Sequence, residues 1–253
     1  MQIPTFPECD HDLVKALIHH SDYVLLDRLQ RSPADGRYFT ALFCRYNSVV
    51  HSLIRHFARS PVQTDYLFAL TWRHILNELD GIDLSPYSIG SADTADLEND
   101  TTADFSLQGW LINLTAAHIN QVKVPEVESI HYVLSEAPPP LWCYTQRALD
   151  RLLPRQRLIV LMAQTFGWSD TRISAYLQAE GESLSAQAVR SELEIGYQAL
   201  ERSIPADIRT IYLGHPLIAA ASPSEAGLMT FEVDEADLQP AGSRPVRIQP
   251  ANA

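Results

Sequence analysis

The stretch that decides the fold is 143–204, CYTQRALDRLLPRQRLIVLMAQTFGWSDTRISAYLQAEGESLSAQAVRSELEIGYQALERSI. Pro154, the pair Gly167-Trp168 and Gly181 divide it into four segments. Each segment carries apolar residues at helical spacing, and proline and glycine are the residues that most often separate helices. The stretch therefore predicts a unit of four helices.

Polar residues at the start of the last two segments indicate where these helices begin. Ser169 or Asp170 can cap the third helix, and Ser183 or Ser185 can cap the fourth, because their side-chain oxygens accept from free backbone N–H groups. A short helix, a turn and a longer helix with an apolar inner stripe is the layout of a helix-turn-helix. The stripe consists of Val189, Leu193, Gly196 and Leu200. The alternative is a fragment of a helical bundle that binds no DNA.

The charge of the chain is acidic overall but unevenly distributed. The 253 residues carry a net charge of −12, whereas proteins that hold DNA by neutralising phosphates are usually basic. Residues 61–141 contain twelve acidic and two basic residues, and residues 142–202 contain seven of each. The predicted helix-turn-helix is thus neutral and does not repel DNA.

Composition also bears on compartment and on metal sites. No apolar run approaches the roughly 20 residues that cross a bilayer, so we expect no membrane partner. The chain has three cysteines, Cys9, Cys44 and Cys143, and no two of them have CxxC spacing. An odd number without this spacing predicts neither a disulfide framework nor a zinc site. We therefore expect a cytoplasmic protein without metal or cofactor.

The N-terminal half also has helical periodicity. The segments 12–31, 37–60, 62–82 and 105–121 carry apolar residues at helical spacing. Between the last two lies the stretch 80–104, which has seven acidic and no basic residues and is typical of a solvated loop. We predict an all-α chain: a helical domain at 1–124 with the acidic loop 80–104, a proline-rich linker at 125–141, a helix-turn-helix domain at 142–214 and a flexible tail at 215–253.

The C-terminal motifs resemble those of the sigma-70 family of bacterial RNA polymerase sigma factors, of the extracytoplasmic-function type. The segment 149–157, LDRLLPRQR, is similar to the family's L-x-x-L-P-x-x-x-R opening of region 4. ISAYL at 173–177 is similar to its I-A-x-x-L, and SAQAVRSEL at 185–193 to its S-x-x-x-V-[KR]-S-x-L. In this family, region 4 recognises the −35 promoter element.

The N-terminal half resembles region 2 of the family, which binds polymerase and melts the −10 element. The segment 45–50, RYNSVV, is similar to the family's Y-x-x-x-V-x, and 105–118, FSLQGWLINLTAAH, to its F-x-x-W-L-x-x-I-A-x-N melting segment. The helix expected to bind polymerase departs from the family's acidic-Leu-x-Gln-Glu core, since Tyr66, Ala69 and Leu70 take the polar positions.

The resemblance implies three sets of contact residues. For the −35 element these are Ser185, Gln187, Arg190 and Ser191 on bases, with Arg155, Arg157 and Arg172 on phosphates. For the −10 element they are Trp110, Asn113, His118, Asn120 and Lys123, of which Trp110 also fits the core. For polymerase they are Tyr66, Leu67, Leu70, Trp72, His74 and Glu78. Glu192 and Glu194 stand where basic residues are common in the family.

We therefore expect a sigma factor that binds the RNA polymerase core and promoter DNA, with an anti-sigma factor as a further partner. The acidic loop is expected to cover the DNA-binding faces until polymerase docks. No catalytic motif is present, so no enzyme is expected. One alternative is a sigma-fold interaction module that binds polymerase or a regulator without recognising DNA. A stand-alone helix-turn-helix repressor is a third possibility, which the net charge disfavours.

Overall fold

The computed structural model describes residues 4–84 and 106–214. The prediction of an all-α chain is confirmed, because these residues form ten α-helices and short 3-10 turns and contain no strand. Most of the acidic stretch 80–104 and the whole tail at 215–253 lie outside the described residues, so the expectations for the loop and the tail stay untested.

The chain divides into two compact units whose bounds differ from those expected for the domains. Among the described residues, the first unit comprises 4–84, 106–153 and 197–214, and the second comprises 154–196. The predicted four-helix unit is therefore split, since its first helix belongs to the first unit. This helix, α6 (Pro139–Asp150), packs on two helices of the N-terminal half.

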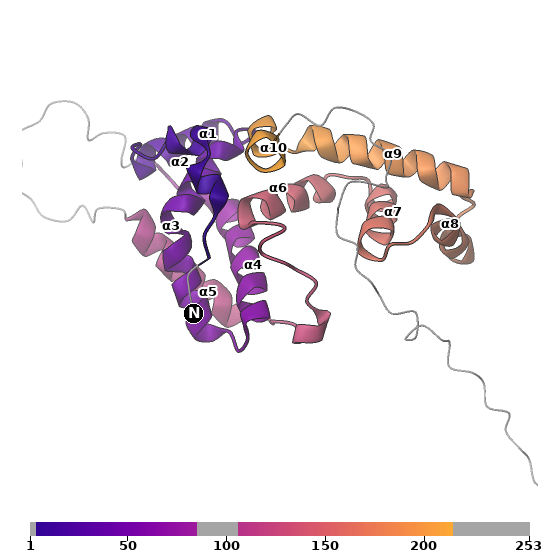
Figure 1. The fold of residues 1–253 in the computed structure, drawn as a ribbon, viewed down its shortest axis with the longest axis horizontal. Coiled ribbons are helices and arrows are strands. Elements are labelled where there is room, and N and C mark those ends of the chain that lie inside the picture. Colours follow the sequence, from indigo (N-terminus) through magenta and orange to yellow (C-terminus); the bar gives the residue numbers. More distant parts are fainter. Residues whose placement is uncertain (1–3, 85–105, 215–253) are drawn as a thin grey trace, which may run out of the picture. The chain divides into compact units, whose positions relative to one another are not determined.

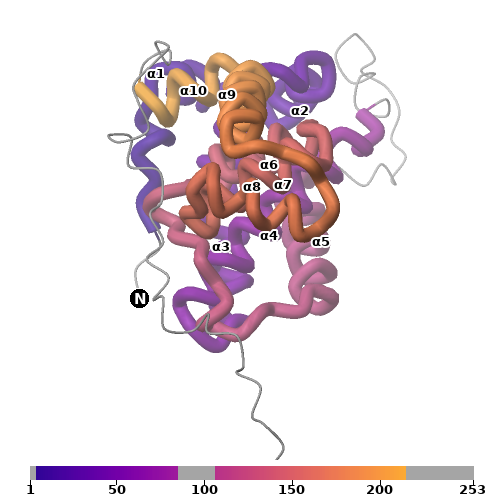
Figure 2. Tube along the Cα trace, turned by 90° about the vertical axis from the view of Figure 1, so that its right-hand side faces the viewer, coloured from indigo at the N-terminus to yellow at the C-terminus, as the bar shows by residue number. Residues whose placement is uncertain are grey.

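Two long helices organise the first unit. They are α3 (Gly36–Phe57) and α4 (Pro61–Leu79), and α5 (Leu107–Gln121) packs against both. The short α1 (Asp12–Lys15), α2 (Asp22–Arg31) and α10 (Ala206–Leu213) gather at one end of this bundle, as Figures 1 and 2 show. Ser21 begins α2 by accepting from the backbone N–H of Val24, so the predicted helix 12–31 is two helices.

Aromatic rings fill the centre of the first unit. Phe39 and Phe43 of α3 contact Trp72 of α4 edge-on, with ring centroids 5.8 and 5.0 Å apart. Phe68 packs against both Phe43 and Trp72. All four side chains are at most 1% exposed. Burial of side chains of this size is the main favourable term in the stability of the unit.

The expectation that the cysteines form no disulfide is wrong. Cys9, in the 3-10 turn Pro7–Asp10, is bonded to Cys44 of α3, 35 residues away. Phe6 explains how this turn is held beside α3, because its buried ring contacts Phe43 with centroids 4.8 Å apart. Only Cys143 is a free thiol, and it is buried. The cysteines therefore do not support the expected cytoplasmic location.

Candidate nucleic-acid interface

Three helices form the described part of the second unit. They are α7 (Pro154–Thr165), α8 (Asp170–Ala179) and α9 (Ala186–Ser203), whose last residues continue into the first unit. Their buried apolar side chains, each less than 9% exposed, are Ile159, Val160, Met162, Ile173, Leu177, Val189 and Leu193. Most of the apolar stripe predicted from the sequence is therefore the inner face of α9.

Gly196 allows α7 and α9 to approach closely. A β-carbon at this position would lie 2.9 Å from Cγ2 of Val160, closer than carbon atoms pack. The glycine costs α9 some helix propensity because it leaves more backbone freedom in the unfolded chain. Its position in the apolar stripe is thus explained by packing.

The start of α8 is fixed by Gly167 and by Ser169, one of the two predicted capping residues. Gly167 takes a φ of +59°, which favours glycine, and ends the turn after α7. The Ser169 hydroxyl accepts from the backbone N–H of Arg172 and so caps α8. The guanidinium of Arg172 lies 4.6 Å from the centroid of the Trp168 ring, a cation–π geometry. Arg172 remains exposed and is available to a phosphate.

The turn between α8 and α9 is held from α8. The Ser174 hydroxyl and the Gln178 amide both donate to the carbonyl of Leu184, at 2.6 and 3.1 Å. Gly181 supplies the positive φ of +91° that the turn requires. The Ser185 hydroxyl accepts from the N–H of Ala188, so this residue, one of the two predicted candidates, caps α9. These contacts set the direction in which α9 leaves the turn.

The predicted base-contacting residues share one exposed face of α9. Gln187, Arg190 and Ser191 are three and four residues apart, a spacing that places them side by side on a helix, and all are exposed. Ser185 is exposed immediately before them. Glu194 continues the same face one turn later and is exposed as well. A polar surface near the N-terminus of the second helix is the part that a helix-turn-helix inserts into the major groove.

Ion pairs modify the charge of this face. Nε of Arg190 lies 2.9 Å from the carboxylate of Asp170, and Nη2 of Arg155 lies 2.9 Å from that of Glu192. The Gln156 amide also donates to Glu192. The acid at 192 is thus compensated within the unit, so its repulsion of phosphate is smaller than the sequence suggests. Both arginines are themselves engaged, although Arg190 keeps 71% of its side chain exposed.

Arg157, the third predicted phosphate contact, differs from Arg155 and Arg172. It is half-buried and already has an interaction partner within the protein. A half-buried guanidinium reaches a phosphate less readily than an exposed one, because its own contacts must first be broken. Of the three arginines, Arg172 is the best placed, and Arg155 is exposed but paired with Glu192.

The residues predicted to contact the −10 element lie on or just after α5, in the first unit. Asn113, Asn120 and Lys123 are exposed, although the Asn120 amide donates to the carbonyl of Ala116. Trp110 is half-buried and packs against the hydrophobic core, in keeping with the second interpretation of this residue. The exposed part of the predicted set is therefore small and carries one cation.

His118 faces α4 instead of the polar surface of α5. Its Nδ1 lies 3.1 Å from the hydroxyl of Thr71, and its ring stacks on that of His74 with centroids 4.6 Å apart. Burial, and secondarily the nearby His74, lower the pKa of His118 to about 4. The side chain is thus a neutral packing element at neutral pH, a role that helical spacing alone does not reveal.

This arrangement predicts a pH dependence of stability. Because the folded pKa of His118 lies below the unfolded value of about 6.5, the unfolded chain binds the proton first as the pH falls. The stability associated with neutral His118 is complete above the unfolded pKa and is lost as the pH falls towards 4. We expect His118→Gln to reduce the drop in urea midpoint between about pH 7 and pH 4.5 relative to wild type. Equal drops would contradict this assignment, since the carboxylates contribute alike to both proteins.

The predicted polymerase-binding residues require a correction. Leu67 and Trp72 are 0% and 1% exposed, so they belong to the core and cannot form a docking surface. Tyr66, Leu70 and His74 are half-buried, and Glu78 alone of the set is exposed. The reason is that α4 packs on α3, α5 and α6 and is enclosed on most sides.

The structure also groups residues that no sequence motif predicts. Arg147, Arg151, Arg202 and Arg209 line one cleft in the first unit together with Tyr144. Arg147 and Arg151 lie in α6 and directly after it, and Arg202 and Arg209 lie at the end of α9 and in α10. The two pairs are more than 50 residues apart in the sequence, so no local pattern brings them together. The abundance of arginine over lysine, of which there are two, is the only trace in the sequence.

No protein-family model matches this chain, and no curated protein or solved structure matches it either. Within residues 4–84 and 106–214, no three His, Cys, Asp or Glu side chains are grouped to hold a metal ion. None of the helices in this part of the chain is long and apolar enough to cross a membrane.

Proposed function

We propose that this protein is a sigma-like transcription initiation factor that binds the bacterial RNA polymerase core and recognises a −35 promoter element with the first turns of α9. The observation that carries the proposal is the exposed face formed by Gln187, Arg190 and Ser191 near the start of α9, which follows the shorter α8 after a turn. The ordered motifs at 149–157, 173–177 and 185–193 support the same interpretation.

The chemistry of this face suits base recognition. A glutamine amide can bond bidentately to adenine, and a guanidinium to guanine, whereas serine accepts either base. Arg155 and Arg172 flank the face and are placed to contact the phosphate backbone. DNA must compete with Asp170 for Arg190, so isolated DNA binding is expected to be weak. Polymerase would supply the remaining affinity by holding the second unit at the promoter.

The first unit would contribute the polymerase contact and the −10 contact. Glu78, at the end of α4, and Asn113 and Lys123, on or just after α5, are exposed and remain candidates for these contacts. The enclosed part of α4 is excluded from docking by its burial.

Substitutions on α9 test the proposal. Promoter-specific run-off transcription with purified core polymerase and genomic fragments is expected to fall about tenfold for Gln187→Ala and for Arg190→Ala, because each bidentate base contact is worth roughly 1–3 kcal/mol. Core binding should be unchanged. Gln198→Ala is the matched control, since Gln198 is an exposed glutamine near the other end of the same helix.

Two outcomes would count against the proposal. Core binding without use of any promoter would exclude an initiation factor. An equal loss of transcription in Gln187→Ala and Gln198→Ala would show that the first turns of α9 have no special role.

The ion pairs of α9 favour a second candidate, a sigma-fold interaction module that binds polymerase or a regulator without recognising DNA. Arg190 and Arg155 are both paired with acids of their own unit, and Glu194 adds an exposed negative charge to the same face. Such a surface suits a protein partner with mixed charges. This module would bind core polymerase and leave Gln187→Ala without effect on transcription.

A further inference from the structure

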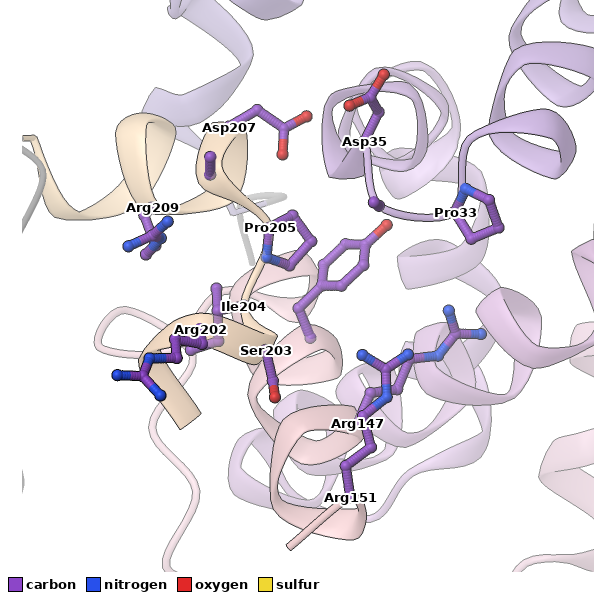
Figure 3. Close-up of a pocket in the computed structure, with 13 residues that line it drawn as sticks. Pro33, Asp35, Arg147, Arg151, Arg202, Ser203, Ile204, Pro205, Asp207 and Arg209 are labelled. Atoms are coloured by element: carbon purple, nitrogen blue, oxygen red, sulfur yellow. The ribbon is translucent and has the colours of Figure 1, made fainter. Parts of the chain in front are cut away.

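A cleft of about 800 Å³ lies within the first unit, beside the turn that precedes α3. The end of α6 forms one side, and the junction of α9 with α10 forms the other. Figure 3 shows Arg147 and Arg151 on the first side and Arg202 and Arg209 on the second. In a chain of net charge −12, four arginines around one cleft concentrate positive charge.

Two acids, Asp35 and Asp207, also line the cleft and offset only part of the charge of the four arginines. The Asp207 carboxylate accepts from the backbone N–H groups of Gly36 and Arg37, at 3.1 and 2.7 Å, and so caps the start of α3. The Asp35 carboxylate lies 3.5 Å from the guanidinium of Arg37. Both aspartates therefore serve the turn and the start of α3.

The four arginines fall into two pairs. Arg147 donates to the carbonyl of Leu76 and lies 3.6 Å from Asp80, and Arg209 lies 3.5 Å from Glu201. These two are held by the fold. Arg151 and Arg202 are exposed, and their guanidinium groups have no hydrogen bond or ion pair within residues 4–84 and 106–214. They are the cations that the cleft offers to a ligand.

Tyr144 is the most buried residue of the lining and has an unused hydrogen-bonding group. It is 4% exposed, and its hydroxyl is buried without a partner among the described residues. Burial raises the pKa of Tyr144, so the hydroxyl keeps its proton and can donate. A buried polar group without a partner is unfavourable, so the hydroxyl would gain from an acceptor brought within its reach.

We propose that this cleft binds a small phosphate ester with at least two negative charges, of the nucleoside diphosphate class. Arg151 and Arg202 would hold the phosphates, and the Tyr144 hydroxyl would donate to a phosphate oxygen. Pro33, Ile204 and Pro205 give the organic part apolar walls. The volume lies in the range of small-molecule sites, and a buried donor in a cleft suits a small ligand better than a duplex, which contacts outer surfaces.

The proposal is independent of promoter recognition, since every residue involved belongs to the first unit. Its test uses neither polymerase nor DNA. Failure of the transcription experiment would thus leave it intact, and its failure would leave the initiation-factor proposal intact.

Calorimetric titration of the full chain with ADP, pyrophosphate and adenosine tests the proposal. ADP is expected to bind more tightly than pyrophosphate, and adenosine is expected not to bind. Arg151→Gln and Arg202→Gln should each weaken ADP binding about tenfold, because each removes a charge-assisted contact. Arg59→Gln is the matched control, as it removes an exposed arginine that is not part of the lining.

Tyr144→Phe provides a second variant that keeps the ring and the packing. Since the hydroxyl has no partner, the ligand-free variant should melt at the wild-type temperature or above it. ADP affinity should fall several-fold.

Three results would overturn the proposal. They are no binding of ADP or pyrophosphate at millimolar concentration, an ADP affinity that Arg151→Gln and Arg202→Gln leave unchanged, and equal weakening by Arg59→Gln. A single-stranded oligonucleotide that binds more tightly than ADP, and loses affinity in the same two variants, would instead assign the cleft to nucleic acid.

Discussion

Replacing Trp72 by alanine is expected to lower the free energy of unfolding of the first unit by about 3–5 kcal/mol. The indole is 1% exposed, and three phenylalanine rings, those of Phe39, Phe43 and Phe68, surround it. Truncation removes this apolar contact and leaves a cavity that the neighbouring helices cannot fill. Urea denaturation followed by circular dichroism would measure the loss.

Two further variants make this result specific. Trp72→Phe should cost less, because a ring remains and because the indole N–H, which has no hydrogen-bond partner in the described part of the protein, is removed. Glu78→Ala, at an exposed position of the same helix, should change stability by less than about 0.5 kcal/mol. A stable Trp72→Ala protein that fails to bind core polymerase would restore the discarded interpretation of Trp72 as a docking residue.

The burial of α4 was in principle visible in its sequence. Residues 67–72, LFALTW, are almost continuously apolar, so they occupy every side of a helix. A helix that is apolar all round is enclosed in a core, whereas a docking helix exposes one face. The family resemblance predicts a docking role for this segment, and the burial of Leu67 and Trp72 contradicts that prediction.

The second unit was the more predictable part, because its determinants are local. The Ser169 cap, the glycine at 181 and the inner stripe of α9 act within a few residues of their own helices. The spacing of 187, 190 and 191 likewise fixes a common face without further information. Caps, turn glycines and helical spacing of this kind can be recognised in a single sequence.

Long-range pairings could not be predicted in the same way. The contacts of Arg155 with Glu192 and of Asp207 with the start of α3 join residues 37 and about 170 positions apart. Gly36 is a glycine because a β-carbon there would overlap Ile208 of α10 and lie 2.9 Å from Tyr144. None of these constraints leaves a periodic pattern, so the attachment of α6 and α10 to the first unit emerges only from the structure.

The Cys9–Cys44 bond is the long-range contact with the largest expected effect. Replacing both cysteines by serine should lower the free energy of unfolding by about 2–4 kcal/mol, because the bond restricts the unfolded chain over a loop of 35 residues. Phe6 and the following turn would then be held against α3 by packing alone. Urea midpoints of wild type and variant, measured without reductant, give the difference.

Adding reductant separates the effect of the Cys9–Cys44 bond on stability from the effect of the two serine substitutions. With dithiothreitol, the wild-type midpoint should fall towards that of the double variant, whose own midpoint should not move. Thiol titration in denaturant should find one thiol per chain before reduction, that of Cys143, and three after it. Three thiols in freshly purified protein, with no change of midpoint on adding reductant, would show that Cys9 and Cys44 do not pair. In a reducing compartment the chain would hold both as thiols, and the first unit would then have the lower stability of the reduced form.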